Sequence, residues 1–529
     1  MPSVTDPLAR SYLDLRWNFD PAAGTAAGDA ASDARLGSFD EVSIKRQLAA
    51  FRAMAGAVEE LEIADLQDEI DRTALLDEIR VSTFRFQHER PHIHDPAFWL
   101  SHLFGAYQGL LDRSDDEPER RAAAALARLQ ATPEFLASAA ATLRNPPPVM
   151  LGTALAMLEG GARLPAELAE LFGALAPANA EALTTAGVEA ARALAHFKTS
   201  LRTDLQVNPA ELSFAVGEDE FNRRLHHEHA LRATAPELWR YGLRLVEETA
   251  EAMQNAALAL SPGAPWAETV RRLRADGLER SLLPSYADEI GRARGFVAAS
   301  GLVALPAVEL RVATTPAYLE HYVPAVWCQP AAPGEEHRGG CLYVTESRAG
   351  ATHSRHETWA WAAAEAWPGH FLQRQVAAAQ SSIVRQHLWT PLTVRGWALY
   401  AEELLAEAGF AAGPEERLMG LLRRLRAAVR VLLDVGLHTR GMTPSEGVSY
   451  AVEHLAVDRD EAMEMVRRAS ARPTYALADA VGRRELLALR DDWRARAGPG
   501  APLRDFHEAL LAYGGLPVSL IRWGMGLDD

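Results

Sequence analysis

The chain has 529 residues and a formal charge of −17; 48% of its residues are hydrophobic and 24% are charged. This composition is typical of a globular protein with a large core. The acidic balance argues against a nucleic-acid partner, because such proteins usually present a basic face. Lysine occurs only as Lys45 and Lys198, which excludes a glycine-rich phosphate loop ending in lysine.

The N-terminus, MPSVTDPLAR, lacks the basic region and apolar run of a secretion signal. No stretch of the sequence has the length and apolarity of a membrane span. Cys328 and Cys341 are the only cysteines, too few for a zinc cluster of their own or a disulfide framework. We therefore expect a cytoplasmic protein without a membrane partner, while the sequence sets no oligomeric state.

Helical periodicity dominates the chain. Apolar residues at steps of three and four predict amphipathic helices over residues 43–62, 66–88, 184–203 and 236–260. Residues 308–314 and 340–345 are the best strand candidates, since they are short, β-branched and bounded by Pro or Gly. The proline-rich residues 145–148 and the Pro/Gly-rich residues 329–340 are predicted to be loops.

Later in the chain, a leucine-rich stripe at helical spacing runs from Leu418 to Leu432. Another helix is predicted to begin at Thr443, because Pro444 and Glu446 complete a capping box. No internal repeat or long linker interrupts these elements. We predict one mainly α-helical domain over residues 1–529, with a few short strands and a deep internal cleft. Two lobes, about 1–300 and 301–529, could flank that cleft.

The most informative segment is 364–370, which reads Ala-Glu-Ala-Trp-Pro-Gly-His. With a histidine in place of Ala364 it would read H-E-x-x-P-G-H, the skeleton of a metallohydrolase site. In such sites histidines hold the ion and the glutamate moves the proton of the attacking water. Alanine cannot hold a metal, so the segment keeps Glu365 and His370 without one expected ligand.

The chain resembles, over nearly its whole length, the bacterial family called domain of unknown function 885, which is similar in pattern to helical zinc metallopeptidases. The resemblance rests on several short segments found in the same order. These segments are W-N-F-D-P at 17–21, D-A-R-L at 33–36, His229 with A-P-E at 235–237, R-H-E at 355–357, the 365–370 motif with L-Q at 372–373, G-W-A-L-Y-A-E at 396–402, D-x-G-L-H-x-R-G at 434–441 and L-R-D-F-H at 503–507.

The departures from the family pattern fall where the metal chemistry should be. The resemblance implies a histidine at Ala364 and a glutamate, the third zinc ligand, at Arg395. A second histidine is replaced by Phe371, and the S-Y-K-I-G segment reads A-D-A-V-G at 478–482. Arg395 beside Zn²⁺ would cost several kcal/mol even at an effective dielectric of about 20. A catalytic zinc usually needs three protein ligands, so we expect that the site is lost and that no cofactor is bound.

Glu365, His370 and Arg395 are the predicted catalytic residues. A carboxylate on the apolar stretch that holds Glu365 would have a raised pKa, which suits a general acid or base. His370 follows the Pro-Gly break and would be its proton-transfer partner. Arg395 would take over the electrostatic role of the metal. The alternative is a structural Glu365–Arg395 ion pair.

A relocated metal site is a second possibility. His353, His356 and Glu357 have helical i, i+3 and i+4 spacing, and together with His370 they could hold an ion. A polar first turn of a helix is the favoured interpretation.

Further residues are predicted to bind substrate. Tyr400 and Arg440 could hold a carboxylate or stabilise an oxyanion, and His438 keeps its family identity. Glu402 lies two turns after Arg395 and could pair with it. Each of these residues could instead be structural.

Trp367 and His229 complete the predicted substrate-binding set. Trp367 would line a core or an apolar pocket. His229 ends the run 226–229, in which adjacent residues point to different faces, so a surface position is favoured over metal binding.

Together these features predict a divergent metallopeptidase-like enzyme without the family zinc. It would perform cyclisation, elimination, isomerisation or hydrolysis on a small amide-like or amino-acid-derived molecule, in specialised metabolism. The alternatives are a metal-dependent peptidase or amidohydrolase with a rebuilt site, and a non-catalytic protein that keeps the cleft for a ligand or partner.

Overall fold

The computed structural model describes residues 3–112, 118–210, 213–278, 280–316, 323–333, 335, 339–346, 353–498 and 500–527. Within these ranges the chain is mainly helical, with a single three-stranded sheet, so the predicted fold class is confirmed. None of the helices in the described ranges has the length and apolarity needed to cross a bilayer.

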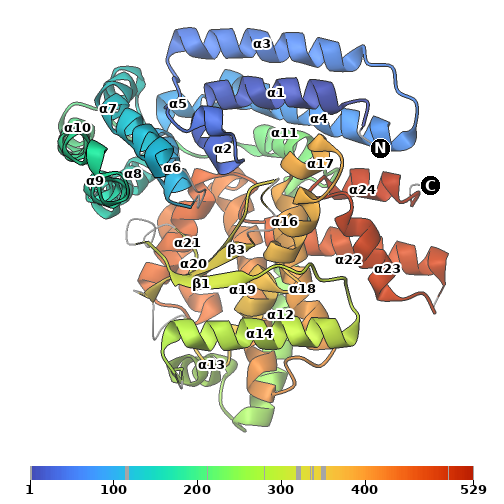
Figure 1. Cartoon of the computed structure of the whole chain (residues 1–529). Coiled ribbons are helices and arrows are strands. Elements are labelled where there is room, and N and C mark those ends of the chain that lie inside the picture. The colour runs from blue at the N-terminus through green and yellow to red at the C-terminus, as the bar shows by residue number, and fades with distance from the viewer. Residues whose placement is uncertain are drawn as a thin grey trace.

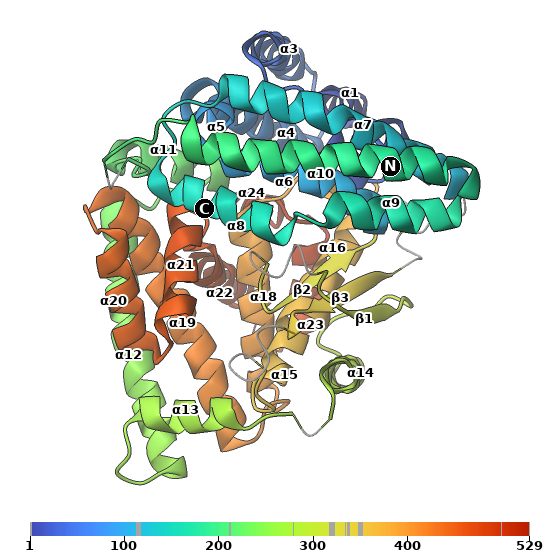
Figure 2. The ribbon, with the colours of Figure 1, turned by 90° about the vertical axis from the view of Figure 1, so that its left-hand side faces the viewer.

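The N-terminal helices form a layer across the top of the molecule (Figures 1 and 2). Several begin at acidic caps: the Asp40 carboxylate accepts hydrogen bonds from Val42 and Ser43 N–H, and the Asp65 carboxylate from Asp68 N–H. The elements of this layer are α1 (Asp6–Phe19), α2 (Pro21–Ala26), η1 (Ala30–Ser32), α3 (Glu41–Glu59), α4 (Leu66–Phe84), η2 (Arg85–Glu89), α5 (Pro91–His94), α6 (Pro96–Asp112), α7 (Pro118–Thr142), α8 (Pro148–Gly160), α9 (Leu164–Leu175), η3 (Pro177–Asn179) and α10 (Ala180–Thr203).

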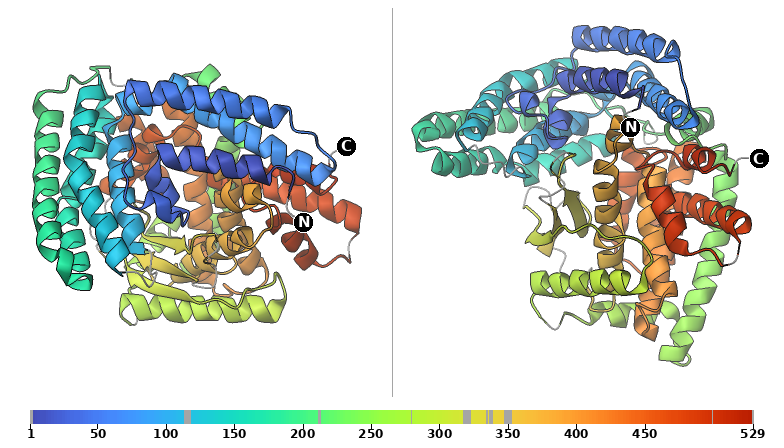
Figure 3. Two further views of the ribbon diagram at one scale, coloured as in Figure 1. Left: turned by 45° about the horizontal axis from the view of Figure 1, so that its top comes forward. Right: turned by 45° about the vertical axis from the view of Figure 1, so that its right-hand side comes forward.

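The remaining helices include the long α12 and α19, which lie side by side; most stand below this layer, whereas α11 lies level with it (Figures 2 and 3). They are α11 (Glu218–His229), α12 (Ala235–Leu260), α13 (Trp266–Ala275), α14 (Leu282–Ser300), α15 (Thr358–Trp361), η6 (Ala362–Ala366), α16 (His370–Ala378), α17 (Ile383–His387), α18 (Pro391–Glu407), α19 (Pro414–Thr439), α20 (Pro444–Leu455), α21 (Arg459–Ala471), α22 (Ala478–Ala497), α23 (Leu503–Leu511) and α24 (Val518–Gly524).

The predicted helices are confirmed with small shifts at their ends. The four stripes of the first half correspond to α3, α4, α10 and α12, and the leucine-rich stripe lies in α19. The start predicted at Thr443 is also confirmed, because its hydroxyl accepts from Glu446 N–H while the Glu446 carboxylate accepts from Thr443 N–H.

The sheet has the order β1-β3-β2, with β1 (Leu310–Thr314) parallel and β2 (Val326–Pro330) antiparallel to β3 (Gly340–Val344). The predictions of β1 and β3 are confirmed, but the loop predicted from residue 329 was wrong at its start. Gln329 and Pro330 end β2, where Pro330 is tolerated because it lies at the end of an edge strand. Residues 334 and 336–338 of that predicted loop lie outside the described residues.

The two faces of the sheet have different surroundings. Val326, Leu342 and Val344 lie on one face and are fully buried in a core cluster that also contains Trp359 and Trp367. Gln329, Cys341 and Tyr343 point to the other face, because successive side chains of a strand alternate. The sheet therefore separates the region around η6 from the region below α6.

The hydrophobic core forms three clusters. One gathers α3, α6, α7, α9 and α10, and a second surrounds α12, α19 and α20. The third joins α1 and α4 to the sheet, η6, α18 and α22, and thus contains residues from both sides of position 300. The division into two lobes stays a prediction.

Candidate active site

Glu365 lies on a π-helical turn that leads into a tight bend. In η6 the Trp367 N–H donates to the Ala362 carbonyl, five residues back. The Trp367–Pro368 peptide is cis, and α16 begins at His370. Gly369 fits the bend because a Cβ there would overlap the Ala364 carbonyl. Such π-turns are frequent at functional sites.

The bend is held against α18 by a single side chain. The indole N–H of Trp397 donates to the Pro368 carbonyl at 2.9 Å and lies 3.3 Å from the Gly369 carbonyl. Trp397 belongs to the G-W-A-L-Y-A-E segment, so the sequence segment with the most specific family match also positions the Glu365–His370 motif.

Burial is the main influence on Glu365. Desolvation raises the pKa of its carboxyl to about 7, while Arg395, Arg423 and hydrogen bonding from the backbone of Cys328 act in the opposite direction. Among the described residues Glu365 forms no ion pair, and the alternative of a direct Glu365–Arg395 pair is not what the structure contains. Its carboxyl group is thus protonated in part near neutral pH.

Arg395 pairs with an aspartate instead. Its guanidinium lies 2.8 Å from the carboxylate of Asp479, and Arg430 reaches the same carboxylate at 3.0 Å. This arrangement depends on the crossing of α18 and α22 at Gly396 and Gly482, where a Cβ on either glycine would overlap the other helix. The backbones approach closely there and bring Arg395 to Asp479.

Glu402 also has a partner that its spacing did not indicate. Its carboxylate accepts two hydrogen bonds from Arg423 of α19, at 2.7 and 2.6 Å, so the suggested pairing with Arg395 is wrong. Arg423 in turn stacks on the Trp361 ring at 3.9 Å. An ion pair between Glu402 and Arg395 was suggested because the two residues share a face of α18. The neighbouring helix α19 provides the partner instead.

His370 is held in its neutral form. Desolvation lowers the pKa of its imidazole to about 3, and Arg395 acts in the same direction. Its Nδ1 atom is buried and has no hydrogen-bond partner among the described residues. Gln373 lies one turn later in α16, and both polar atoms of its buried amide also lack partners in the described part of the chain. Buried polar groups of this kind usually meet a ligand or ordered water.

Arginines give this region its electrostatic character. Desolvation, together with Arg395 and Arg423, lowers the pKa of Arg430 to about 10, while Asp479 acts in the opposite direction. Yet the side chains of Arg430 and Arg395 are 32% and 25% solvent-accessible. Both guanidinium groups are thus half-buried and keep part of their surface open to solvent. Arg374 of α16 forms no ion pair with the described residues, and desolvation lowers its pKa.

The residues of a relocated metal site do not converge. The chain at 353–357 is a turn, not a helix, so the assumed helical spacing was wrong. His353 bonds to Tyr286 and to the Thr345 carbonyl, and His356 bonds to Asp276. Across the described ranges, no group of three metal-ligating side chains gathers. The donor set at 364, 365, 370 and 395 therefore does not fit a zinc ion.

Four of the predicted substrate-binding residues have partners outside the Glu365–His370 motif. Tyr400 bonds to His507 in the core at 2.7 Å, and His438 bonds to the Ala469 carbonyl near the end of α19. Arg440 is exposed and stacks on Trp239. His229 is buried between Thr390 and Thr474, 3.0 Å from each hydroxyl, so its favoured surface position was wrong.

Trp367 lies within the motif but faces the core, where it is 1% exposed and packs edge-on against Phe371. The sequence-based set also omitted Gln373, Arg374, Arg430 and Asp479. The spacing of His370 and Gln373, one helical turn apart, was a usable signal for Gln373. No local signal connects Asp479 to Arg395, since the pair depends on how two helices pack.

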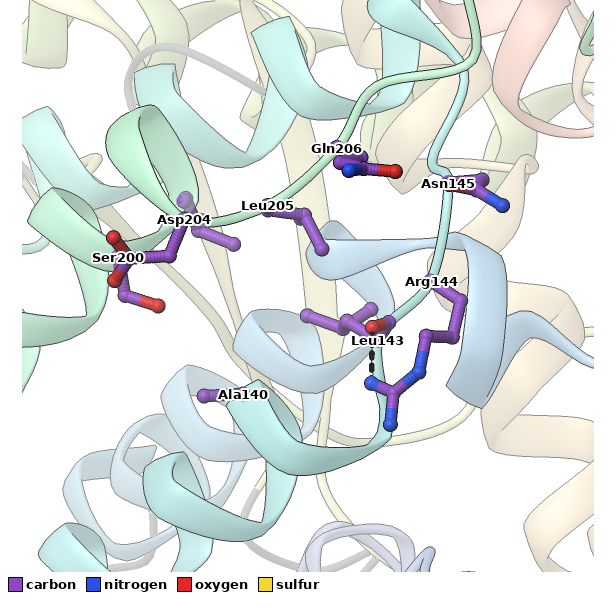
Figure 4. Close-up of a pocket in the computed structure, with 9 residues that line it drawn as sticks. Ala140, Leu143, Arg144, Asn145, Ser200, Asp204, Leu205 and Gln206 are labelled. Carbon is purple, nitrogen blue, oxygen red and sulfur yellow. Dashed lines mark hydrogen bonds between the residues drawn. The ribbon is translucent and has the colours of Figure 1, made fainter.

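Two cavities lie away from the residues around Glu365. One, of about 310 Å³, lies between the ends of α7 and α10 and is lined by Arg144, Asn145 and Ser200, among others. Figure 4 shows the Arg144 side chain turned back to the Leu143 carbonyl in this cavity. The other cavity, of about 250 Å³, lies between the sheet and α6.

Comparison with known proteins identifies relatives of unknown function. A family model described as "Bacterial protein of unknown function (DUF885)" matches residues 21–525. No curated protein matches the sequence. A proposed lipoprotein of unknown function from Shewanella oneidensis has a TM-score of 0.79 and 20% identity, covering 98% of both chains. A proposed lipoprotein from Colwellia psychrerythraea has a TM-score of 0.83 and 18% identity, covering 99% of this chain and 100% of the other.

Proposed function

The chain belongs to the DUF885 family, which is described as of unknown function, and we therefore propose its function from the chemistry of its own residues. It is an enzyme that performs metal-independent acid/base chemistry on a small amide-like or amino-acid-derived molecule. Glu365 transfers the proton, Arg395 stabilises the charge that develops, and His370 supplies a neutral hydrogen-bonding group. The observation that carries the proposal is a Glu365 carboxyl with a pKa of about 7 and no ion pair in the described structure.

The pKa of Glu365 supports a role as general base or acid. A catalytic group works best when its pKa is near the working pH, because both of its forms are then available. A sealed structural pair with Arg395 would instead hold the carboxylate permanently ionised. Asp479 occupies Arg395 and thereby leaves Glu365 free to exchange its proton.

The arginines support an anionic substrate or transition state. Asp479 is shared by Arg395 and Arg430, so one carboxylate balances two guanidinium groups. Arg374 contributes a further cation without an ion-pair partner among the described residues. A fixed guanidinium in a desolvated space stabilises an oxyanion or enolate. The same groups would bind the carboxylate of an amino-acid-derived molecule.

His370 supports the chemistry as a neutral imidazole. With a pKa of about 3 it is uncharged near neutral pH, and its free Nδ1 can donate to or accept from a bound molecule, depending on the tautomer. We therefore assign it hydrogen bonding and substrate orientation beside Glu365, not the role of a cationic acid.

The cytoplasmic location stays a prediction from the sequence. The description of two structural relatives as lipoproteins concerns those proteins.

The test uses chelator-treated protein and a panel of N-acyl amino acids, amino-acid amides and dipeptides, with products followed by mass spectrometry. We expect turnover by the native protein and a loss of about 100-fold or more in Glu365→Gln. Glu407→Gln is the matched control, since Glu407 lies on α18 and is 58% exposed. Circular dichroism of both variants should show the native helical content.

Other outcomes would contradict the proposal in distinct ways. Turnover that disappears on chelation would indicate a metal-dependent hydrolase. Undiminished turnover in Glu365→Gln would remove the assigned proton carrier. Compounds that bind but are never converted would indicate a non-catalytic binding protein.

A further inference from the structure

The cavity of about 250 Å³ lies between the sheet and helix α6. Arg311, Cys341 and Gln329 form one row across the three strands, because Cys341 pairs with Arg311 on β1 and with Gln329 on β2. Their side chains share a face of the sheet, and all three line the cavity. Cys328, the preceding residue of β2, faces the other way and contributes a backbone hydrogen bond to Glu365.

Helices α6 and α2 cover this face of the sheet. Gly105, Gln108, Gly109 and Asp112 of α6 line the cavity together with Thr25 of α2. Gly109 is the point of close approach, since a Cβ there would lie 2.9 Å from the Thr25 methyl group. The cavity thus has a strand floor and a helical roof that come from distant parts of the sequence.

An acidic group with spare acceptors lies in the roof. The Oδ1 atom of Asp112 accepts from the Gln108 amide and, at 3.1 Å, from the Tyr343 hydroxyl. Its Oδ2 atom has no hydrogen-bond partner among the described residues. The Gln108 Oε1 atom is buried and also lacks a partner there. A positively charged amine has the donors to bind both acceptors, and only that of Gln108 is closed to solvent.

A cation lies at the opposite wall. Arg311 is exposed and forms no ion pair with the described residues, yet it is close enough to Asp112 to influence that carboxyl group electrostatically. Burial nevertheless raises the pKa of Asp112 to about 6, so the carboxyl group lacks a sufficient cationic partner. A guanidinium without a partner binds a carboxylate well.

We propose that this cavity is a second binding site, specific for a small zwitterion that carries an amine and a carboxylate. The amine binds at Asp112 and Gln108, and the carboxylate binds at Arg311. The site is separate from the chemistry at Glu365 and does not depend on the function proposed above.

The test is titration calorimetry of the full-length protein with glycine, β-alanine, 4-aminobutanoate and 6-aminohexanoate. This series varies the distance between the two charges, and butylamine and butanoate are controls that carry only one charge each. We expect at least one zwitterion to bind, and both controls to bind at least about tenfold more weakly. Asp112→Asn and Arg311→Gln should each weaken that binding by about tenfold or more.

Matched variants separate this site from the one at Glu365. Asp491→Asn and Arg280→Gln change exposed residues of the same types, 68% and 69% exposed, and should leave binding unchanged. Glu365→Gln should also leave it unchanged. The inference is overturned if no zwitterion binds up to about 10 mM, if Asp112→Asn and Arg311→Gln have no effect, or if only Glu365→Gln abolishes binding. Circular dichroism of each variant verifies folding, and Arg311→Gln, at an exposed position, remains informative if Asp112→Asn fails to fold.

Discussion

Glu365 and His370 share one physical condition, which is that burial favours the neutral form of each side chain. The pKa of the acid is raised to about 7 and that of the imidazole is lowered to about 3. Neighbouring arginines lower the pKa of both groups. They oppose the shift of Glu365 without reversing it, and they add to the shift of His370. A proton can therefore leave or enter Glu365 near neutral pH while His370 stays uncharged.

This condition predicts how stability depends on pH. The pKa of Glu365 rises from an ordinary value of 4.5 to about 7 on folding. Its contribution to stability is therefore complete below pH 4.5 and is lost as the pH rises through 7. Relative to Glu365→Gln, the native protein should lose up to roughly 3 kcal/mol of unfolding free energy between these values.

Urea unfolding at pH 5 and pH 8 measures this difference. Glu407→Gln, at an exposed position of α18, should show no such change relative to the native protein. A difference between native protein and Glu365→Gln that is the same at both pH values would show that burial does not shift this carboxyl.

At the scale of elements, the crossing of α18 and α22 determines which charges meet. The two helices touch at Gly396 and Gly482, and this contact places Arg395 beside Asp479. The sequence alone predicted the helices and the position of Glu365, because periodicity and caps are local signals. It could not predict that Asp479 pairs with Arg395, or Arg423 with Glu402, because those pairs depend on which helices become neighbours.

The glycine crossing can be tested by adding one methyl group. In Gly482→Ala the Cβ would overlap the Leu392 carbonyl, so the helices must separate at a cost of roughly 1–3 kcal/mol. Turnover should fall as well, because Arg395 moves with α18. The control is Gly291→Ala in α14, where no atom lies within 4 Å of the added Cβ; it should be neutral or slightly stabilising. Equal unfolding free energies for the two variants would contradict the role of the crossing.

For the whole molecule, the overall arrangement follows that of proteins that share about a fifth of its sequence. The helical fold was predictable because amphipathic stripes occur along the entire chain. Arg395 acts electrostatically on both Glu365 and His370, and the catalytic role of the three residues stays a prediction from the motif. Substrate binding by Tyr400, His438 and His229 stays a prediction, and the hydrogen bonds described above give each of them a structural partner.

The proposal that a metal site was lost at Ala364 and Arg395 leads to a prediction for the whole fold. If Ala364 and Arg395 occupy former ligand positions, Ala364→His combined with Arg395→Glu should bind zinc. A ligand that binds only the folded state raises the unfolding temperature with its concentration. Zinc should therefore stabilise the double variant and leave the native protein unchanged in thermal scans. An unchanged unfolding temperature in the double variant would show that these positions were misassigned.

Strand β2 has a consequence for which sequence changes the protein tolerates. Cys328 and Gln329 are neighbours in the chain, yet Cys328 packs against the core cluster while Gln329 lines the cavity on the other face of the sheet. A point substitution in β2 therefore alters either the core or the cavity. Deletion or insertion of one residue would exchange the faces of every later side chain in the strand. A change in the length of this five-residue strand would thus disturb the core and the cavity at once.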